Sequence, residues 1–130
     1  MTMPIPGGDL ERAVLEAVWA LDEPTAREVH ERVGEPRGLV YTTIAKVLDR
    51  LHDKGLVARH KVGQAFVYRA KRERGLVTRA LTRDVIGRVL GSEPKPAIAA
   101  LVDAVEEIDP ALLDELARTV NARRRKRRGP

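Results

Sequence analysis

A chain of 130 residues, 43% hydrophobic and 33% charged, has the composition of one globular domain or two small ones. It has no cysteine and its three histidines are widely separated, so we expect no disulfide, thiol chemistry, metal site or cofactor. No apolar run approaches the ~20 residues that span a bilayer, and the first residues lack a signal-peptide core, so we expect a cytoplasmic protein without membrane contact.

The net charge of +5 is distributed unevenly along the chain. Residues 37–72 hold nine Lys and Arg against two acids, which gives this block a net charge of +7. Residues 1–36 carry −5, residues 73–120 carry −3, and residues 121–130 add six bases without an acid. A single internal basic block is typical of a nucleic-acid-binding surface.

The first helices are expected to form a small apolar core. Residues 1–8, with two Pro and two Gly, predict a flexible leader, and Asp9 can cap a helix that ends near Leu21. Trp19 lies on the apolar stripe of this helix and is expected in the core.

A second, short helix is predicted over about residues 26–33. Thr25 with Glu28 three residues on predicts a capping box at its start, and residues 34–38 are expected to form a loop.

The segment Leu39–Lys54 has the strongest helical pattern in the chain. Its apolar residues recur on one face, namely Val40, Ile44, Val47, Leu48 and Leu51. The N-terminal half of the opposite face carries hydroxyls and an amine but no acid. Two short helices, a loop and such a third helix form the helix-turn-helix pattern, whose last helix enters the major groove of DNA.

A basic hairpin is predicted directly after this helix. Gly55 ends the helix, and residues 56–61 and 66–70 alternate apolar and basic side chains around a turn that contains Gly63. A helix-turn-helix followed by a hairpin is a winged helix, which we assign to residues 9–72. The predicted fold class is therefore mainly α with a small β-hairpin wing.

Nine residues are candidates for DNA contact. The reading edge would use Tyr41, Thr42, Thr43 and Lys46, whereas the bases on the wing and in the loop would hold phosphates. The alternatives are burial for Tyr41, a plain surface position for Thr43, and pairing of Arg50 with Asp49 or Asp53. The full set is Arg37, Tyr41, Thr42, Thr43, Lys46, Arg50, Arg59, Lys61 and Arg69.

From residue 73 the pattern is helical only. Three amphipathic helices are expected over residues 73–120, with a break at 91–96 and an Asp109-Pro110 start to the last helix. Such short helices cannot bury their apolar surface alone, so we expect this segment to form a homodimer. The residues assigned to dimerisation are Leu81, Val85, Val89, Leu101, Val105, Leu112, Leu113 and Leu116.

Residues 121–130 contain the run RRRKRR. This run predicts either a disordered, solvated tail or an additional non-specific DNA arm, and we assign the disordered tail.

Several stretches with correct spacing resemble the BlaI/MecI/CopY family of bacterial repressors. They are GDLERAVLEAVWAL, REVHERV, LVYTTIAKVLDRLHDKGLV and FVYRA, which cover residues 8–70, with a looser match at ALVDAVEEID. The resemblance implies a dimeric repressor whose winged helices read a palindromic operator and whose C-terminal helices hold the dimer together.

The resemblance also bears on how repression would be relieved. In the beta-lactam branch a sensor protease system cuts the dimerisation segment, and the matching position here is Asp103-Ala104, where staphylococcal-type members have Asn-Phe. A regulatory protease is thus a possible partner, although this site departs from the pattern of those members. The copper branch uses a cysteine cluster, which this chain lacks.

The sequence therefore predicts a sequence-specific, homodimeric DNA-binding repressor. Two alternatives stay open, a winged-helix regulator that senses a small molecule and a winged helix used as a protein-interaction module. An enzyme is not expected, because the chain has no paired histidines and no Gly-rich phosphate loop that follows a strand.

Overall fold

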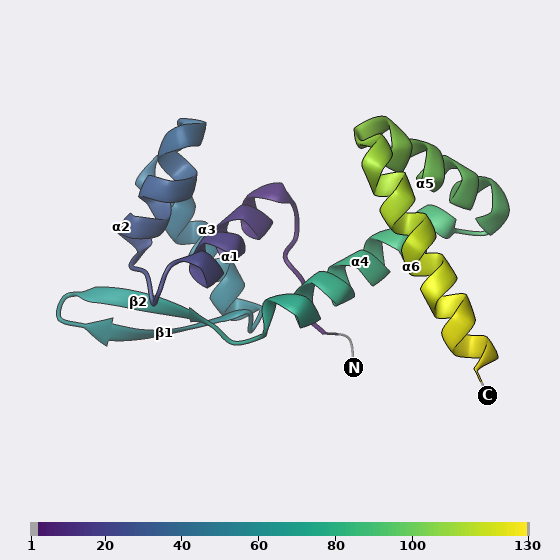
Figure 1. Cartoon of the computed structure of the whole chain (residues 1–130). Helices are drawn as coiled ribbons and strands as arrows, with labels where there is room; N and C mark the ends of the chain where they lie inside the picture. The colour runs from purple at the N-terminus through teal and green to yellow at the C-terminus, as the bar shows by residue number, and fades with distance from the viewer. Residues whose placement is uncertain (1–2, 130) are drawn as a thin grey trace. The chain divides into compact units, whose positions relative to one another are not determined.

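The computed structural model describes residues 3–129, which form six α-helices and one antiparallel hairpin (Figure 1). This mainly helical architecture with a hairpin confirms the predicted fold class. In chain order the elements are α1 (Asp9–Ala20), α2 (Ala26–Val29), η1 (His30–Gly34), η2 (Glu35–Arg37), α3 (Tyr41–Asp53), β1 (Val57–Val62), β2 (Ala65–Ala70), α4 (Arg74–Leu90), α5 (Pro94–Ile108) and α6 (Pro110–Arg128).

The described chain divides into two compact units. The first ends at Asp84 and the second begins at Val85, so the division falls inside α4 rather than at its start. The first unit therefore contains the winged helix together with the first part of α4.

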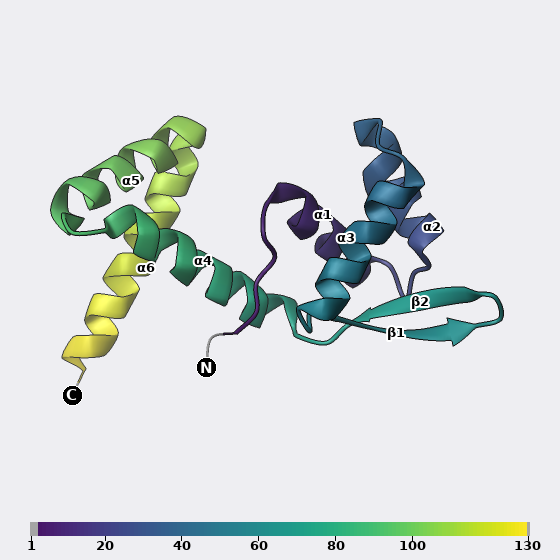
Figure 2. The same ribbon diagram turned by 180° about the vertical axis from the view of Figure 1, so that it is seen from behind.

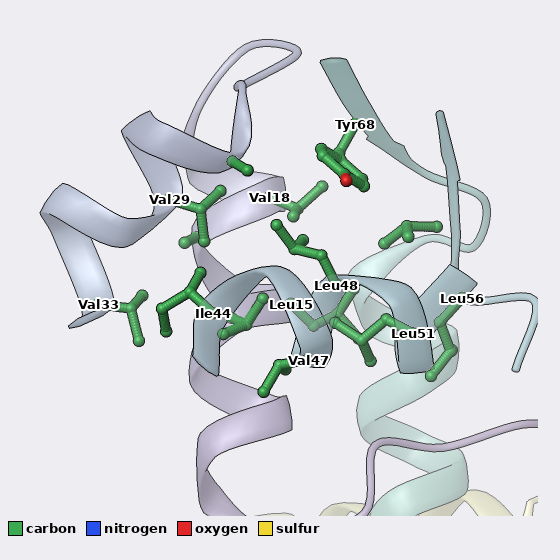
Figure 3. Close-up of a cluster of buried hydrophobic side chains, with 14 of the residues drawn as sticks. Leu15, Val18, Val29, Val33, Ile44, Val47, Leu48, Leu51, Leu56 and Tyr68 are labelled. Atoms are coloured by element: carbon green, nitrogen blue, oxygen red, sulfur yellow. The ribbon is translucent and has the colours of Figure 1, made fainter. Parts of the chain in front are cut away.

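The core of the first unit is built mainly from Val and Leu side chains. Figure 3 shows side chains of α1, α2, α3 and the hairpin converging on one cluster. Four residues of α3 have no exposed surface, and each buried Val, Leu or Ile stabilises the fold by about 1.5–3 kcal/mol. These residues are Ile44, Val47, Leu48 and Leu51.

Val40 does not belong to this buried face, contrary to the prediction. Its side chain is 64% exposed, because the helix begins at Tyr41 and Val40 has the extended backbone of an N-cap, with φ −86° and ψ 158°. Leu39 packs against the core from the neighbouring position. Val40 lies one residue ahead of the helix, so its side chain does not follow the helical spacing of the residues after it.

The capping box at the start of α2 is confirmed. The backbone N–H of Thr25 donates to Glu28 Oε1 at 2.9 Å, and the N–H of Glu28 donates to Thr25 Oγ1 at 3.2 Å. After Val29 the helix widens into the π-helical turn η1 and then tightens into the 3₁₀ turn η2. Much of the segment expected to be a loop is therefore helical, and Gly38, with φ 68°, ends it.

Three contacts join α1 to the start of α4 and the residues just before it. Trp19 is half-buried against the core instead of fully inside it, because its indole N–H donates to the carbonyl of Arg72 at 3.1 Å. The guanidinium of Arg74 lies 5.5 Å from the Trp19 ring and pairs with Glu16 at 3.2 Å. Val77 of α4 is buried in the same core.

The hairpin has the predicted position and a two-residue turn. Val57 pairs with Ala70 and Val62 with Ala65, so Gly63 and Gln64 form the turn, and Gly63 has the positive φ of 64° that such turns favour. Figures 1 and 2 show the hairpin running beneath α2, with its tip extending past the helices. The middle of β2 is fixed by the N–H of Tyr68, which donates to the carbonyl of Pro24 at 2.8 Å.

The start of the chain is more ordered than the expected flexible leader. Residues 3–8 have no helix or strand, but Pro6 is buried, and Gly8, not Asp9, occupies the N-cap of α1. Residues 1–2 of the predicted leader lie outside the described residues.

In the second unit α5 and α6 pack against each other, yet neither helix has a buried residue. The predicted start of α6 is confirmed, since Asp109 Oδ1 accepts from the N–H of Ala111 at 3.0 Å. The prediction of a disordered tail is wrong for residues 121–128, which continue α6. Ala, Arg and Lys favour helix, and bases in a last turn are stabilised by the helix dipole. Residue 130 lies outside the described residues.

Gly34 is required where η1 meets α3. A Cβ at this position would overlap the His30 imidazole and lie 2.9 Å from Cγ1 of Ile44. We expect Gly34→Ala to destabilise the fold by about 1–3 kcal/mol in denaturant unfolding.

Gly75 of α4 is the matched control, because a Cβ there meets nothing within 4 Å. Gly75→Ala is expected to be neutral or to stabilise by up to ~1 kcal/mol. Equal stability of the two variants would contradict the close approach at Gly34.

Candidate nucleic-acid interface

The first two turns of α3 have an exposed face. Tyr41 is 45% exposed, Thr42 and Lys46 are exposed, and Thr43 is half-buried. Ile44 between them points into the core, which fixes the rotation of the helix and keeps these polar groups outward. The structure thus brings together the four residues that were predicted as the reading edge.

Tyr41 is a surface residue with a fixed ring. The His30 imidazole packs against it edge-on, with ring centroids 5.9 Å apart and an interplanar angle of 83°. A half-exposed ring of this kind presents its hydroxyl without filling the core, which favours the contact interpretation over burial.

Arg37 lies just ahead of this helix. Its guanidinium donates to the carbonyl of Val33 at 3.0 Å while the residue stays exposed. One N–H group is thereby used to anchor the side chain, and a guanidinium has four further N–H donors.

One face of the wing is basic and aromatic. Arg59 and Lys61 lie on the same face as Phe66 and Tyr68, to which they are cross-strand neighbours. The Arg59 guanidinium lies 4.9 Å and the Lys61 amine 5.7 Å from the centre of the Phe66 ring. These cation–π contacts hold both bases against the hairpin.

Asp49 ties this face of the wing to α3. Its Oδ1 accepts from the Arg59 guanidinium at 2.7 Å. Burial raises the pKa of the Tyr68 phenol beside this pair, although the hydrogen bond and charge of Arg59 oppose the rise. Arg59 therefore already has an anionic partner, whereas Lys61 is exposed.

Arg69 lies on the opposite face of the hairpin. It is the cross-strand neighbour of Ala58 and shares a shallow depression with Asp22 and Glu23. The hairpin therefore separates Arg69 from Lys61, so the structure does not bring all the predicted wing bases to one surface.

Arg50 has a different partner from either one predicted. Its Nε lies 3.7 Å from Glu11 Oε2 of α1, and Lys54 Nζ lies 2.6 Å from Glu11 Oε1. The Gly7 N–H also donates to this carboxylate at 3.0 Å. Pairing of Arg50 with Asp49 or Asp53 is thus corrected to pairing with Glu11, since the start of α1 approaches the end of α3.

Burial disfavours the charged form of Glu11, which is only 8% exposed. The hydrogen bonds from Lys54 and Gly7, with the charges of Lys54 and Arg50, outweigh burial and lower its pKa. Glu11 is therefore an ionised anchor for the C-terminal end of α3.

Sequence reasoning missed Arg27 as a site residue. A depression of about 450 Å³ lies between the start of α2, the start of α3 and the tip of the wing. The positively charged side chain of Arg27 lines this depression. Its position in the helix before the reading helix could have suggested a phosphate contact. Its lining is Thr25, Ala26, Arg27, Tyr41, Gln64, Ala65, Phe66 and Tyr68.

The residues assigned to dimerisation lie in α4, α5 and α6, and none of them is buried. Leu81, Leu101, Val105, Leu113 and Leu116 are half-buried, while Val85, Val89 and Leu112 are exposed.

Asp103 and Ala104 are exposed within α5. They lie inside a helix, so a protease that binds its substrate in extended form would require local unfolding of this segment.

Among residues 3–129 there is no cluster of three His, Asp or Glu side chains able to hold a metal ion. Within the same range no helix is long and apolar enough to cross a membrane.

A helix-turn-helix with a basic wing and an outward-facing third helix defines the chain as a winged-helix DNA-binding protein. The model of the penicillinase repressor family matches residues 7–122. The chain is also 37% identical to "Transcriptional regulator BlaI" of Mycobacterium tuberculosis over 114 residues, which cover 87% of this chain and 81% of that protein. The chain belongs to the penicillinase repressor family, and it is a DNA-binding repressor, not an enzyme.

Solved structures of other winged-helix regulators are also similar. The PcaV transcriptional regulator from Streptomyces coelicolor matches 82% of this chain and 77% of its own, with 25% identity and a TM-score of 0.47. A MarR family protein from Bacillus stearothermophilus matches 82% and 76%, with 18% identity and a TM-score of 0.47.

Replacing Glu11 tests its role as an anchor for α3. Its folded-state pKa lies below the ordinary value of 4.5, so its stabilisation is complete above that pH and is lost as the pH falls through the folded-state pKa. We expect Glu11→Gln to lower the free energy of unfolding by about 1–3 kcal/mol at pH 7, and the difference from the wild type to shrink below pH 4.5.

Glu16 on the same helix is the control for this measurement. Its pair with Arg74 is solvent-exposed, so Glu16→Gln is expected to cost less than ~1 kcal/mol. A constant difference between Glu11→Gln and the wild type from pH 7 to acid would contradict the anchor role.

Asp49→Asn tests whether the Asp49 carboxylate competes with DNA phosphates for the Arg59 guanidinium. The variant frees the guanidinium, so we expect tighter binding to duplex DNA of mixed sequence and a salt dependence steeper by about one unit. Asp53→Asn removes the same charge from α3 but leaves Arg59 paired with Asp49. Equal effects of the two variants in fluorescence anisotropy would show that only net charge matters.

Proposed function

We propose that this protein is a homodimeric repressor that reads a palindromic operator with α3 of each copy. Tyr41, Thr42, Thr43 and Lys46 would contact base edges and nearby phosphates in the major groove. The observation that carries the proposal is the acid-free, exposed end of α3 beside the basic face of the wing.

The phosphate contacts are assigned to the bases that surround this end of the helix. Lys61 is the best placed on the wing, and Arg59 joins it once its bond to Asp49 is exchanged for a phosphate. Arg37 adds a contact ahead of α3. Arg69 and Arg50 contribute less to phosphate binding, because Arg69 lies beside Asp22 and Glu23 and Arg50 is paired with Glu11.

The homodimer is supported by the second unit. Helices α5 and α6 bury no side chain within a single chain, and several large apolar residues are more than one-third exposed. Exposed large apolar side chains in such number are typical of a protein interface, and a closed two-fold dimer is the commonest assembly that covers them. The exposed residues are Val85, Val89, Ile98, Ile108, Leu112 and Val120.

A dimer also explains how so small a reading edge achieves tight binding. Once one copy is bound, the second contact becomes intramolecular, which raises the effective concentration of the second α3 near its half-site. Half-sites one helical turn apart, about 34 Å, are read from one side of the duplex. Loss of the dimer would therefore release DNA without any change to the reading helix.

Two measurements test the proposal on the full chain. Repeated selection of bound fragments from random-sequence DNA is expected to recover an inverted repeat. Light scattering after size exclusion is expected to give about 29 kDa, twice the 14.4 kDa of one chain. A non-repeating recovered site together with the monomer mass would refute the homodimer, and recovery of no sequence at all would refute specific recognition.

A further inference from the structure

The basic run Arg123–Arg128 continues α6 and has no acid among its residues. At 100° per residue, six consecutive positions point in every direction around the helix axis, and all six residues are exposed. Arg118, the preceding base on α6, is paired with Glu115 at 2.7 Å. Among residues 3–129 the structure records no comparable ion pair for any of the six.

These six charges account for the whole positive balance of the protein. The chain has 24 Lys and Arg against 19 Asp and Glu, so the other 124 residues have a net charge of −1. Attraction to a polyanion at long range depends on net charge as well as on local surfaces. The run therefore changes the net charge of the protein from −1 to +5, which strengthens its long-range attraction to a polyanion.

The charge density of the run is comparable to that of duplex DNA. A helix rises about 1.5 Å per residue, so this run presents one positive charge per ~1.5 Å of axis. Duplex DNA carries one negative charge per ~1.7 Å of its axis. Five of the six residues are Arg, whose guanidinium binds phosphate oxygens in pairs.

Like charges three and four positions apart on a helix repel one another. Arg123 faces Lys126 and Arg127 in this way, and the helix dipole offsets only part of the repulsion. A bound polyanion removes the repulsion, so the helical form of the run and phosphate binding favour each other.

The composition of the run argues against other partners. It has no aromatic or large aliphatic side chain, so it lacks the apolar anchors that dominate protein interfaces and the apolar face by which a helix lies in a membrane surface. The family match also ends at residue 122, immediately before the run. The run is thus an addition to what the family model describes.

We propose that Arg123–Arg128 is a second, sequence-independent DNA contact. It binds phosphates of the duplex outside the base pairs that α3 reads. The proposal rests on the proposed function, since a chain already held on an operator presents this run to flanking DNA at high effective concentration. Its contribution is affinity and rate of association, while the choice of sequence remains with α3.

The test compares the full-length wild type with a variant in which all six basic residues from Arg123 to Arg128 are replaced by Gln. Gln also favours helix, so α6 is expected to persist in circular dichroism. The probe is a mixed-sequence duplex of four helical turns, about 40 base pairs, titrated between about 50 and 200 mM salt. The Gln variant is expected to bind roughly tenfold or more weakly at the lowest salt, with a slope smaller by about 2–3 units.

A second variant with Lys at the five Arg positions is the matched control. It retains all six charges, so its slope is expected to stay within about one unit of the wild type. Equal slopes for the wild type and the Gln variant, with both bound to DNA, would overturn this inference and leave the proposed function intact. Loss of binding to phosphatidylserine vesicles by the Gln variant, with its DNA slope unchanged, would also overturn it. Failure of the wild type to bind any DNA would refute both.

Discussion

The packing of one face of α3 into the core is the constraint on which the rest of the winged helix depends. Ile44, Val47, Leu48 and Leu51 have no exposed surface, so the helix cannot rotate about its axis without bringing polar groups into an apolar cluster. The same packing that stabilises the fold therefore decides which side chains face outward. Stability and recognition are set by opposite faces of a single helix.

Polar contacts position what the core does not reach. The hairpin is an isolated pair of strands, which would be marginal alone. It is fixed near its middle, where the Tyr68 N–H donates to Pro24 and the opposite residue Arg59 pairs with Asp49. The far end of α3 is held to α1 through Glu11. The C-terminal half of the reading helix is thus held by ion pairs to both the wing and α1.

The elements that follow from local interactions could be predicted from the sequence. The buried face of α3, the capping box at Thr25 and the turn at Gly63 all depend on residues within a few positions of one another. The ends of the helices were predicted less well. Val40 is exposed ahead of α3, and the Arg123–Arg128 run is helical.

The pairing of charges could not be predicted, because it depends on tertiary approach. Glu11 and Lys54 are 43 positions apart, and no local pattern indicates that their side chains meet. Strand alternation determines which basic residues share a face of the hairpin. Which of the two faces approaches α3 depends on where the core lies. The predicted set of DNA contacts was therefore broader than the surface that the fold assembles.

The internal pairing of bases bears on how a repressor finds one site among many. Arg50 and Lys54 face Glu11, and Arg59 faces Asp49, so three bases of the block that looks most positive in sequence are partly neutralised within the protein. A repressor that bound every sequence tightly would be retained by the competing sites of a genome. Carboxylates that occupy these bases lower that retention, and exchange of Asp49 for a phosphate at Arg59 would return one of the three charges to a duplex that fits α3.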